Sequence, residues 1–183
     1  MGVSIHYSGQ LKEAAMLPLL VEEVEDIAKI LNWTFKSFLT QYPNDVFELT
    51  NSGKDYGIVV SPPECEPVVF IFDYEGHIYA PWLKQYFTDR FYIYNISTKT
   101  QFAGTDVHVK VIELMRHLNK KYFINFTMLD EGEYWETGNR TLLKSKIDFL
   151  GAKINQLANV LENTKMNEGE NLEDFIKRIA RDL

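Results

Sequence analysis

The fold is decided by residues 90–139, which read RFYIYNISTKTQFAGTDVHVKVIELMRHLNKKYFINFTMLDEGEYWETGN. Alternating side chains predict a long strand over the first part, and aromatic and β-branched residues predict a second strand at 123–129. Between them, apolar residues recur at helical spacing. The stretch therefore predicts one β-α-β unit that ends in an acidic, aromatic loop at 130–139. If both strands share a sheet, the right-handed crossover makes them parallel, with their carboxyl ends at one edge.

The helix of this unit begins after Gly104 and has one apolar face. The inward positions of that face are His108, Val111, Ile112, Met115, Leu118 and Tyr122. His117 lies on the opposite side and points to solvent. A buried imidazole needs a hydrogen-bond partner, so the surroundings of His108 have to be explained.

The preceding residues predict further strands and helices. A strand at 3–7, a helix from about residue 14 and a strand at 33–39 would make a first β-α-β unit. Apolar runs at 57–60 and 68–72, separated by a Pro-rich loop, predict a hairpin. We therefore expect an α+β domain with a mixed β-sheet and two crossover helices against one face.

That domain covers residues 1–139, and residues 140–183 predict a C-terminal helical extension made of two helices. Apolar residues alternate spacings of four and three along the first helix, which is a heptad seam. The seam consists of Leu143, Ile147, Leu150, Ile154, Leu157 and Leu161. The simpler interpretation is that both helices pack on the sheet of their own domain. The alternative is a helical arm that pairs with a second copy, which would make the protein a homodimer.

Composition narrows the classes of function. The chain has 183 residues, of which 45% are hydrophobic, and a net charge of −7, which argues against nucleic-acid binding. Its N-terminus has no signal-peptide pattern and no apolar run reaches membrane-spanning length, so we expect a cytoplasmic protein without membrane contact. The single cysteine, Cys65, lies between Glu64 and Glu66, whose carboxylates disfavour a reactive thiolate.

Polar residues gather where the predicted strands end. The strand ends and the acidic loop contribute His6, Lys99, Gln101, Glu131, Tyr134, Trp135 and Glu136. We expect these residues and His108 to form a binding site at the carboxyl edge of the sheet, where ligands of open α/β folds bind. In particular, we predict that His108 approaches Glu131 or Glu136 beneath Trp135.

Two interpretations of His108 stay open. A helix N-terminus disfavours protonation, so a neutral imidazole beside a carboxylate could act as a base or a metal ligand. No close-spaced ligand motif and no Cys pair occurs, however, so we expect no metal and no cofactor. A lone histidine on an apolar helix face is more often a satisfied core residue, and a closed, waterless pair would be structural.

Four motifs taken together resemble a family of uncharacterised bacterial proteins. The motifs are SIHYSG, PPECEPVVF, KTQFAG with His108 shortly after it, and LDEGEYWETG. The resemblance spans residues from about 4 to 139. It implies a bacterial cytoplasmic α+β protein, with no established activity and no assigned catalytic or binding residue.

The sequence is compatible with two classes of function. The first is a non-enzymatic module that binds an unknown protein or a small ligand, which the acidic charge, the aromatic loop and the lack of a recognisable catalytic set favour. The second is a hydrolase-like enzyme that uses His108 and a carboxylate, with or without a metal ion.

Overall fold

The computed structural model describes residues 2–181. The first half of the chain forms β1 (Ser4–Leu11), α1 (Met16–Ile30), β2 (Thr34–Ser37), η1 (Pro43–Asp45), β3 (Tyr56–Ser61), β4 (Val68–Phe72) and η2 (Pro81–Gln85). The second half forms α2 (Arg90–Tyr94), β5 (Ile96–Lys99), α3 (Gly104–Tyr122), β6 (Phe123–Asp130), α4 (Tyr134–Thr137), α5 (Arg140–Asn163) and α6 (Leu172–Arg181). The predicted α+β class is confirmed.

The strands form two three-stranded sheets, in the orders β5-β1-β6 and β2-β3-β4. Every neighbouring pair in both sheets is antiparallel, so the expectation of one mixed sheet was wrong. The predicted hairpin is confirmed as β3 and β4. The predicted first β-α-β unit is not closed within one sheet, because β2 pairs with β3 rather than with a neighbour of β1.

The second β-α-β unit keeps its predicted geometry in spite of the antiparallel pairing. β1 lies between β5 and β6 and is antiparallel to each, so β5 and β6 run in the same direction. In register, Ser4 faces Lys99 and Ile5 faces Asp130. The carboxyl ends of β5 and β6 therefore lie at the same sheet edge, beside the start of β1.

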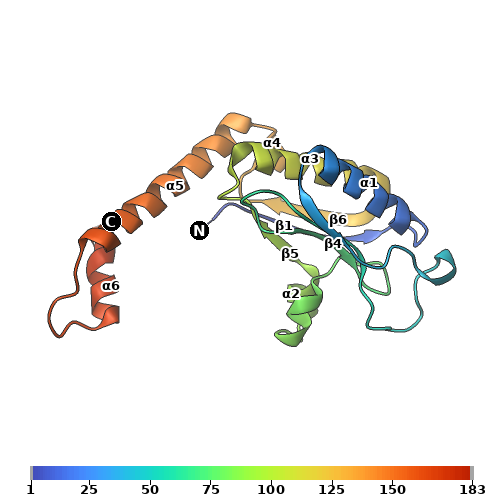
Figure 1. Ribbon diagram of the computed structural model, residues 1–183, viewed down its shortest axis with the longest axis horizontal. Helices are drawn as coiled ribbons and strands as arrows, with labels where there is room; N and C mark the ends of the chain where they lie inside the picture. Colours follow the sequence, from blue (N-terminus) through green and yellow to red (C-terminus); the bar gives the residue numbers. More distant parts are fainter. Residues whose placement is uncertain (1, 182–183) are drawn as a thin grey trace.

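Helices α1 and α3 lie side by side over one face of the sheets, as Figure 1 shows. Each turns an apolar stripe inward, because its apolar residues recur every three or four positions. In α3 every predicted inward residue is buried, and His117 is exposed, as predicted. Of these two helices, α3 connects two strands of one sheet, whereas α1 leads from β1 to β2 in the other sheet.

The two sheets are joined at Tyr7. Its hydroxyl donates a hydrogen bond to the carbonyl oxygen of Val69, at 3.0 Å, and accepts one from the backbone N–H of the same residue, at 2.8 Å. The side chain is fully buried, and this burial raises the pKa of the phenol. Tyr7 therefore links the central strand of one sheet to an edge strand of the other through the backbone N–H and C=O of one residue.

The long strand predicted from residue 90 is shorter in the structure. Residues 90–94 form helix α2, and only Ile96–Lys99 form β5. The Asp89 carboxylate caps α2 by accepting a hydrogen bond from the N–H of Phe91, at 2.9 Å. Alternating aromatic residues suggested a strand here, but this cap favours a helical turn.

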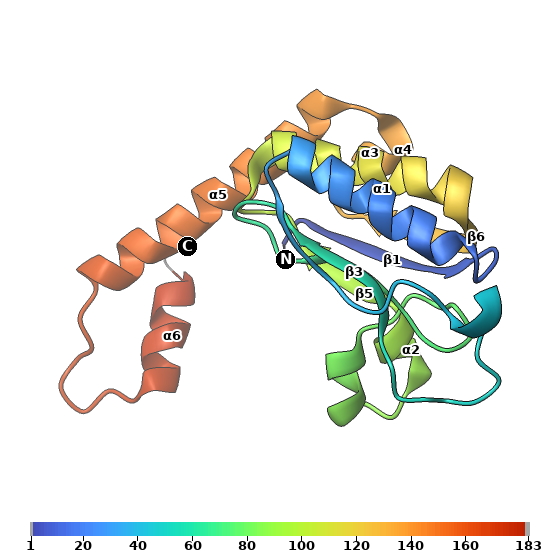
Figure 2. The same ribbon diagram turned by 45° about the vertical axis from the view of Figure 1, so that its right-hand side comes forward.

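The C-terminal helices project away from the sheets, in both views of the chain (Figures 1 and 2). Leu143 is the one residue of α5 that is buried, near the contacts of this helix with α3 and α4. Helix α5 contacts helices α3 and α4, and the choice between packing on its own domain and pairing with a second copy stays a prediction. Asn171 caps α6 by accepting a hydrogen bond from the N–H of Asp174, at 2.9 Å. Within residues 2–181, no helix combines the length and the apolar character that crossing a membrane requires.

Candidate functional site

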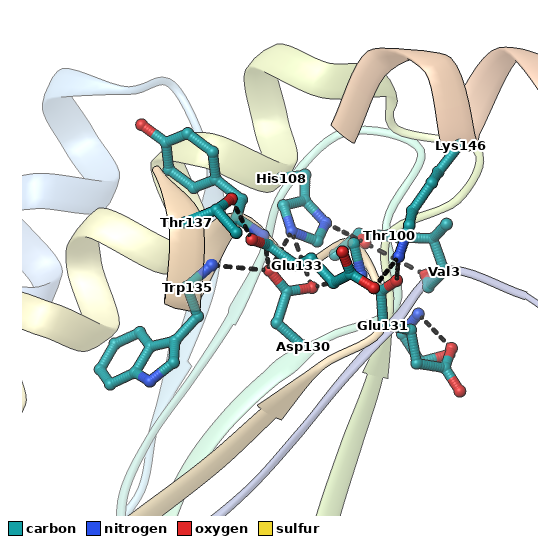
Figure 3. A network of polar contacts seen from close by, with 12 residues as sticks. Val3, Thr100, His108, Asp130, Glu131, Glu133, Trp135, Thr137 and Lys146 are labelled. Atoms are coloured by element: carbon teal, nitrogen blue, oxygen red, sulfur yellow. Dashed lines mark hydrogen bonds and ion pairs between the residues drawn. The ribbon is translucent and has the colours of Figure 1, made fainter. Parts of the chain in front are cut away.

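His108 lies in the core beneath the shared edge of β5 and β6. Helical spacing from Val111 and Ile112 turns it inward, and its side chain is 0% exposed. Its Nδ1 lies 2.7 Å from Oγ1 of Thr100, and its Nε2 lies 3.2 Å from both carboxylate oxygens of Asp130. Figure 3 shows the imidazole between these two side chains. A carboxylate only accepts hydrogen bonds, so Nε2 carries a proton in this pair.

Asp130 is held by the backbone of the loop that follows it. Its carboxylate accepts hydrogen bonds from the N–H groups of Gly132, Tyr134 and Trp135, at 2.7, 2.8 and 3.0 Å. Burial raises the pKa of Asp130, but the hydrogen bond and charge of His108 and the N–H groups of Trp135 and Gly132 outweigh it. The pKa of Asp130 therefore lies below its ordinary value, and the group is a carboxylate at neutral pH.

Gly132 makes this close packing possible. A Cβ atom at this position would lie 2.6 Å from Cδ1 of Leu143, 3.0 Å from Oδ1 of Asp130 and 3.0 Å from Cε1 of His108. Any larger residue would push the loop away from the His108–Asp130 pair. The glycine thus allows the loop, the start of α5 and the imidazole to meet at one point.

The prediction that His108 pairs with Glu131 or Glu136 was wrong. The acceptor is Asp130, the last residue of β6, and neither Glu131 nor Glu136. Side chains on successive residues of a strand point to opposite faces, so a shift from Asp130 to Glu131 reverses the direction of the carboxylate. Trp135 does join the network, but through its backbone N–H on Asp130.

Glu131 meets His6 instead. Its Oε1 lies 3.5 Å from Nε2 of His6, and its Oε2 accepts a hydrogen bond from the N–H of Ser4, at 2.8 Å. The two side chains are 32% and 39% exposed. Since β1 alternates between buried residues such as Ile5 and half-buried ones such as His6, this pair lies on the opposite face from His108.

Tyr134 and Trp135 form a lid rather than an open aromatic surface. The Arg116 guanidinium stacks 5.5 Å from the centre of each ring and donates hydrogen bonds to both backbone carbonyls, at 3.1 and 2.7 Å. Both rings are partly buried against the core. Glu136, in the same short helix, is exposed. The acidic loop is thus packed over α3, which leaves the carboxylates of Glu131, Glu133 and Glu136 at the surface.

Lys99 and Gln101 lie beside the N-terminus of the chain. A Cβ atom at Gly2 would lie 3.0 Å from Cε of Lys99 and 3.0 Å from Oε1 of Gln101. Lys99 is half-buried, with its Nζ 5.9 Å from the centre of the Phe102 ring. Gln101 is 6% exposed, and its Oε1 has no hydrogen-bond partner among the residues that the structure describes. The predicted site residues therefore fall into separate groups rather than into one crevice.

No protein-family model, no curated protein and no solved structure matches this chain.

The His108–Asp130 pair has the geometry of a structural core pair. Both side chains are 0% exposed, and both imidazole nitrogens have partners. The nearby cavity, of about 390 Å³, is lined by Gly2, Val3, Glu131, Lys146, Phe149 and Leu150, a set that does not include His108. A general base or a metal ligand needs access to its substrate or ion, and this pair has none in the structure.

Sequence reasoning missed two groups of residues. Thr100 and Asp130 form the first group, and both lie where a predicted strand ends. Whether Asp130 or Glu131 faces His108 depends on a single step of strand register. The second group lies away from this edge, in the turn after β4. Among residues 2–181, Asp73, Glu75 and His77 form the one group of three side chains whose ligand atoms are close enough to share a metal ion.

Proposed function

We propose that the chain is a non-enzymatic protein-binding module that binds its partner through an aromatic projection formed by residues 81–94. The observation that carries this proposal is the exposure of five large aromatic side chains within eleven residues. They are Trp82 (47% exposed), Tyr86 (72%), Phe87 (39%), Phe91 (65%) and Tyr92 (51%). Figure 2 shows η2 and α2 extending from the sheets on the side opposite α1 and α3.

The projection is preformed rather than loose. The rings of Phe87 and Tyr92 stack with centroids 4.9 Å apart, and Phe91 packs edge-on to Tyr92 at 5.5 Å. Its base is anchored by Ile93, which is buried and accepts a hydrogen bond from the N–H of Ala80, at 3.0 Å. Rigid exposed aromatic side chains are the residue type that dominates the energy of protein interfaces, because they bury much area at little entropic cost.

The net charge of −7 favours a partner with a basic surface and disfavours nucleic acid. The hydrolase-like alternative finds no support in the geometry, since His108 is enclosed and fully partnered. The resemblance to uncharacterised bacterial proteins adds no activity to either reading.

We further propose that α5 makes the protein a homodimer. In its heptad seam, Ile147, Ile154 and Leu161 occupy the a positions, and Leu143, Leu150 and Leu157 the d positions. Isoleucine at a and leucine at d favour a two-stranded coiled coil. Ile154, Leu157 and Leu161 are 40%, 40% and 44% exposed, so the distal part of the seam is open to a second copy.

A paired variant tests the aromatic projection. Wild-type protein and the double variant Phe91→Ser, Tyr92→Ser are immobilised and exposed to an extract of the source cells, and the bound proteins are quantified. A candidate partner is one that the variant loses, and titration of the purified pair should then show binding weakened about 30-fold or more.

Leu49→Ser is the matched control, because Leu49 is 99% exposed but lies outside the projection. This control should retain the partner at wild-type affinity. Identical sets of bound proteins for wild type and the double variant would contradict the proposed binding surface.

A further inference from the structure

The turn after β4 reads DYEGH over residues 73–77 and places three potential metal ligands together. The N–H of Asp73 bonds to the carbonyl of His77, at 3.0 Å, and the N–H of Gly76 bonds to the carbonyl of Asp73, at 3.1 Å. Gly76 has a φ of +81°, and a Cβ atom there would lie 2.4 Å from the Phe47 ring. The turn therefore depends on this glycine, and it brings the side chains of Asp73, Glu75 and His77 together.

One imidazole nitrogen of His77 is unsatisfied in this cluster. Its Nδ1 is buried and has no hydrogen-bond partner within the described part of the chain. It lies 3.6 Å from Oδ1 of Asp73 and 3.7 Å from Oε2 of Glu75, too far for a hydrogen bond. Ligand atoms that bind one ion at roughly 2.0–2.2 Å in tetrahedral geometry are themselves separated by about 3.4 Å. The observed spacing is thus close to that of atoms sharing an ion.

The carboxylate of Asp73 is oriented as a metal ligand usually is. The side chain is 2% exposed, and its Oδ1 accepts hydrogen bonds from the N–H groups of Glu75 and His77, both at 2.9 Å. Its Oδ2 accepts a hydrogen bond from the Tyr94 hydroxyl, at 2.7 Å. Such supporting hydrogen bonds hold a ligand in place before the ion arrives.

We propose that Asp73, Glu75 and His77 bind one divalent transition-metal ion, of the type of Zn²⁺ or Mn²⁺. One imidazole nitrogen with two carboxylates is a mixed donor set that suits these ions better than Ca²⁺ or Mg²⁺, which prefer oxygen ligands alone. His77 also lines a cavity of about 370 Å³, together with Gln10, Phe91 and Tyr94. This cavity lies at the base of the aromatic projection, which contributes Phe91 and Tyr94 to its lining.

The site stands independently of the proposed protein binding, because none of its three ligands belongs to the projection. The competing arrangement is a protonated His77 that forms an ion pair with both carboxylates and binds no metal. The two arrangements differ in a measurable way, since only the first binds an added ion with a stoichiometry of one.

Calorimetric titration of Zn²⁺ and of Mn²⁺ into the full chain, freed of metal by a chelator, tests the proposal at neutral pH. We expect one site with a Kd of about 10 μM or tighter for at least one ion, and a rise in Tm when that ion is present. His77→Ala and Glu75→Gln should each weaken binding about tenfold or more. Asp73 is left unchanged because it is buried and supports the turn.

His117→Ala is the control, because His117 also lies beside a carboxylate, 2.7 Å from Glu23, but belongs to no group of three potential metal ligands among residues 2–181. This variant should bind the ion like wild type. The proposal is overturned if neither ion binds one-to-one, or if His77→Ala and Glu75→Gln bind as tightly as wild type. Circular dichroism checks that each variant keeps its fold.

Discussion

At the scale of single residues, Asp130 organises the shared edge of β5 and β6. It accepts hydrogen bonds from three backbone N–H groups and pairs with His108, so one carboxylate connects a strand, a loop and a helix. A buried carboxylate–imidazole pair is weak evidence of net stabilisation, but removing one partner leaves the other buried and unsatisfied. We therefore infer that the main effect of the His108–Asp130 pair is to hold the loop after β6 in position.

We predict that Asp130→Asn lowers the free energy of unfolding by about 3 kcal/mol at neutral pH. The folded-state pKa of Asp130 is depressed, so its stabilisation is fully present above its unfolded pKa of about 3.9 and is lost as pH falls through the folded pKa. Urea unfolding at pH 7 and at about pH 3 measures the gap between wild type and variant. The gap should narrow at the lower pH, and an equal gap at both would contradict this account.

The surroundings of Cys65 make its thiol unreactive in the folded chain. Burial and the charge of Glu66 raise the pKa of its thiol to about 12. At pH 8 the thiolate fraction is then only about one in 10⁴, so we predict very slow reaction with a disulfide reagent in the folded chain. Reaction in guanidinium chloride should be fast, because the unfolded thiol has an ordinary pKa. Rapid labelling of the folded protein would show that the thiol is accessible.

At the scale of elements, α1 and α3 are held together by Glu23. Its carboxylate lies 2.8 Å from Nζ of Lys121 and 2.7 Å from Nε2 of His117, and it also accepts a hydrogen bond from the Tyr122 hydroxyl. Burial raises the pKa of Glu23, but these three partners lower it to about 2.

We predict that Glu23→Gln lowers the free energy of unfolding by about 1 kcal/mol at pH 7. Since the folded pKa is depressed, this contribution is present above about pH 4.3 and fades as the pH falls toward 2. Tm values measured from pH 7 down to about pH 2.5 follow the effect. Glu22→Gln is the control, because Glu22 is exposed on the outer side of the same helix. An equal loss of stability in Glu22→Gln would show that Glu23 has no specific role in joining α1 and α3.

Helix α5 contains a glycine in its interior that the fold does not need. A Cβ atom at Gly151 would meet nothing within 4 Å. We therefore predict that Gly151→Ala stabilises the protein by about 0.5–1 kcal/mol, because alanine restricts the unfolded chain and favours the helix. Thermal unfolding measures the change. A destabilised variant would reveal that another helix packs closely against this position in solution.

At the scale of the whole molecule, the open part of the α5 seam predicts a dimer. Changing Leu150 and Leu157 together to Lys should give a folded monomer in light scattering, because two charges at d positions cannot be buried between helices. Ala152→Lys with Asn159→Lys is the matched control, since both residues lie on the outer side of the same helix and are exposed. A wild-type monomer at every concentration would rule out the dimer, and an unfolded Leu variant would place the seam within one chain.

Local patterns were sufficient for much of this fold. Helical spacing predicted α1, α3 and α5 and the inward position of His108, and β-branched runs predicted β3, β4 and β6. The error at residues 90–94 arose because alternating aromatic residues fit a strand and a capped helical turn equally well. The site was less predictable, because Asp130 and Glu131 are adjacent acidic residues, and only the register of β6 decides which of them faces His108.

Local sequence patterns were enough to predict the helices α1, α3 and α5, the apolar face of each, and the shared edge at which β5 and β6 end. These properties depend on neighbours within a few positions, or on the handedness of one connection. Three features became visible only in the folded chain: β1 inserts between β5 and β6, α5 projects away from the sheets, and Asp73, Glu75 and His77 converge. Those outcomes depend on contacts between distant segments, whose energies compete over the whole chain and leave no periodic trace in the sequence.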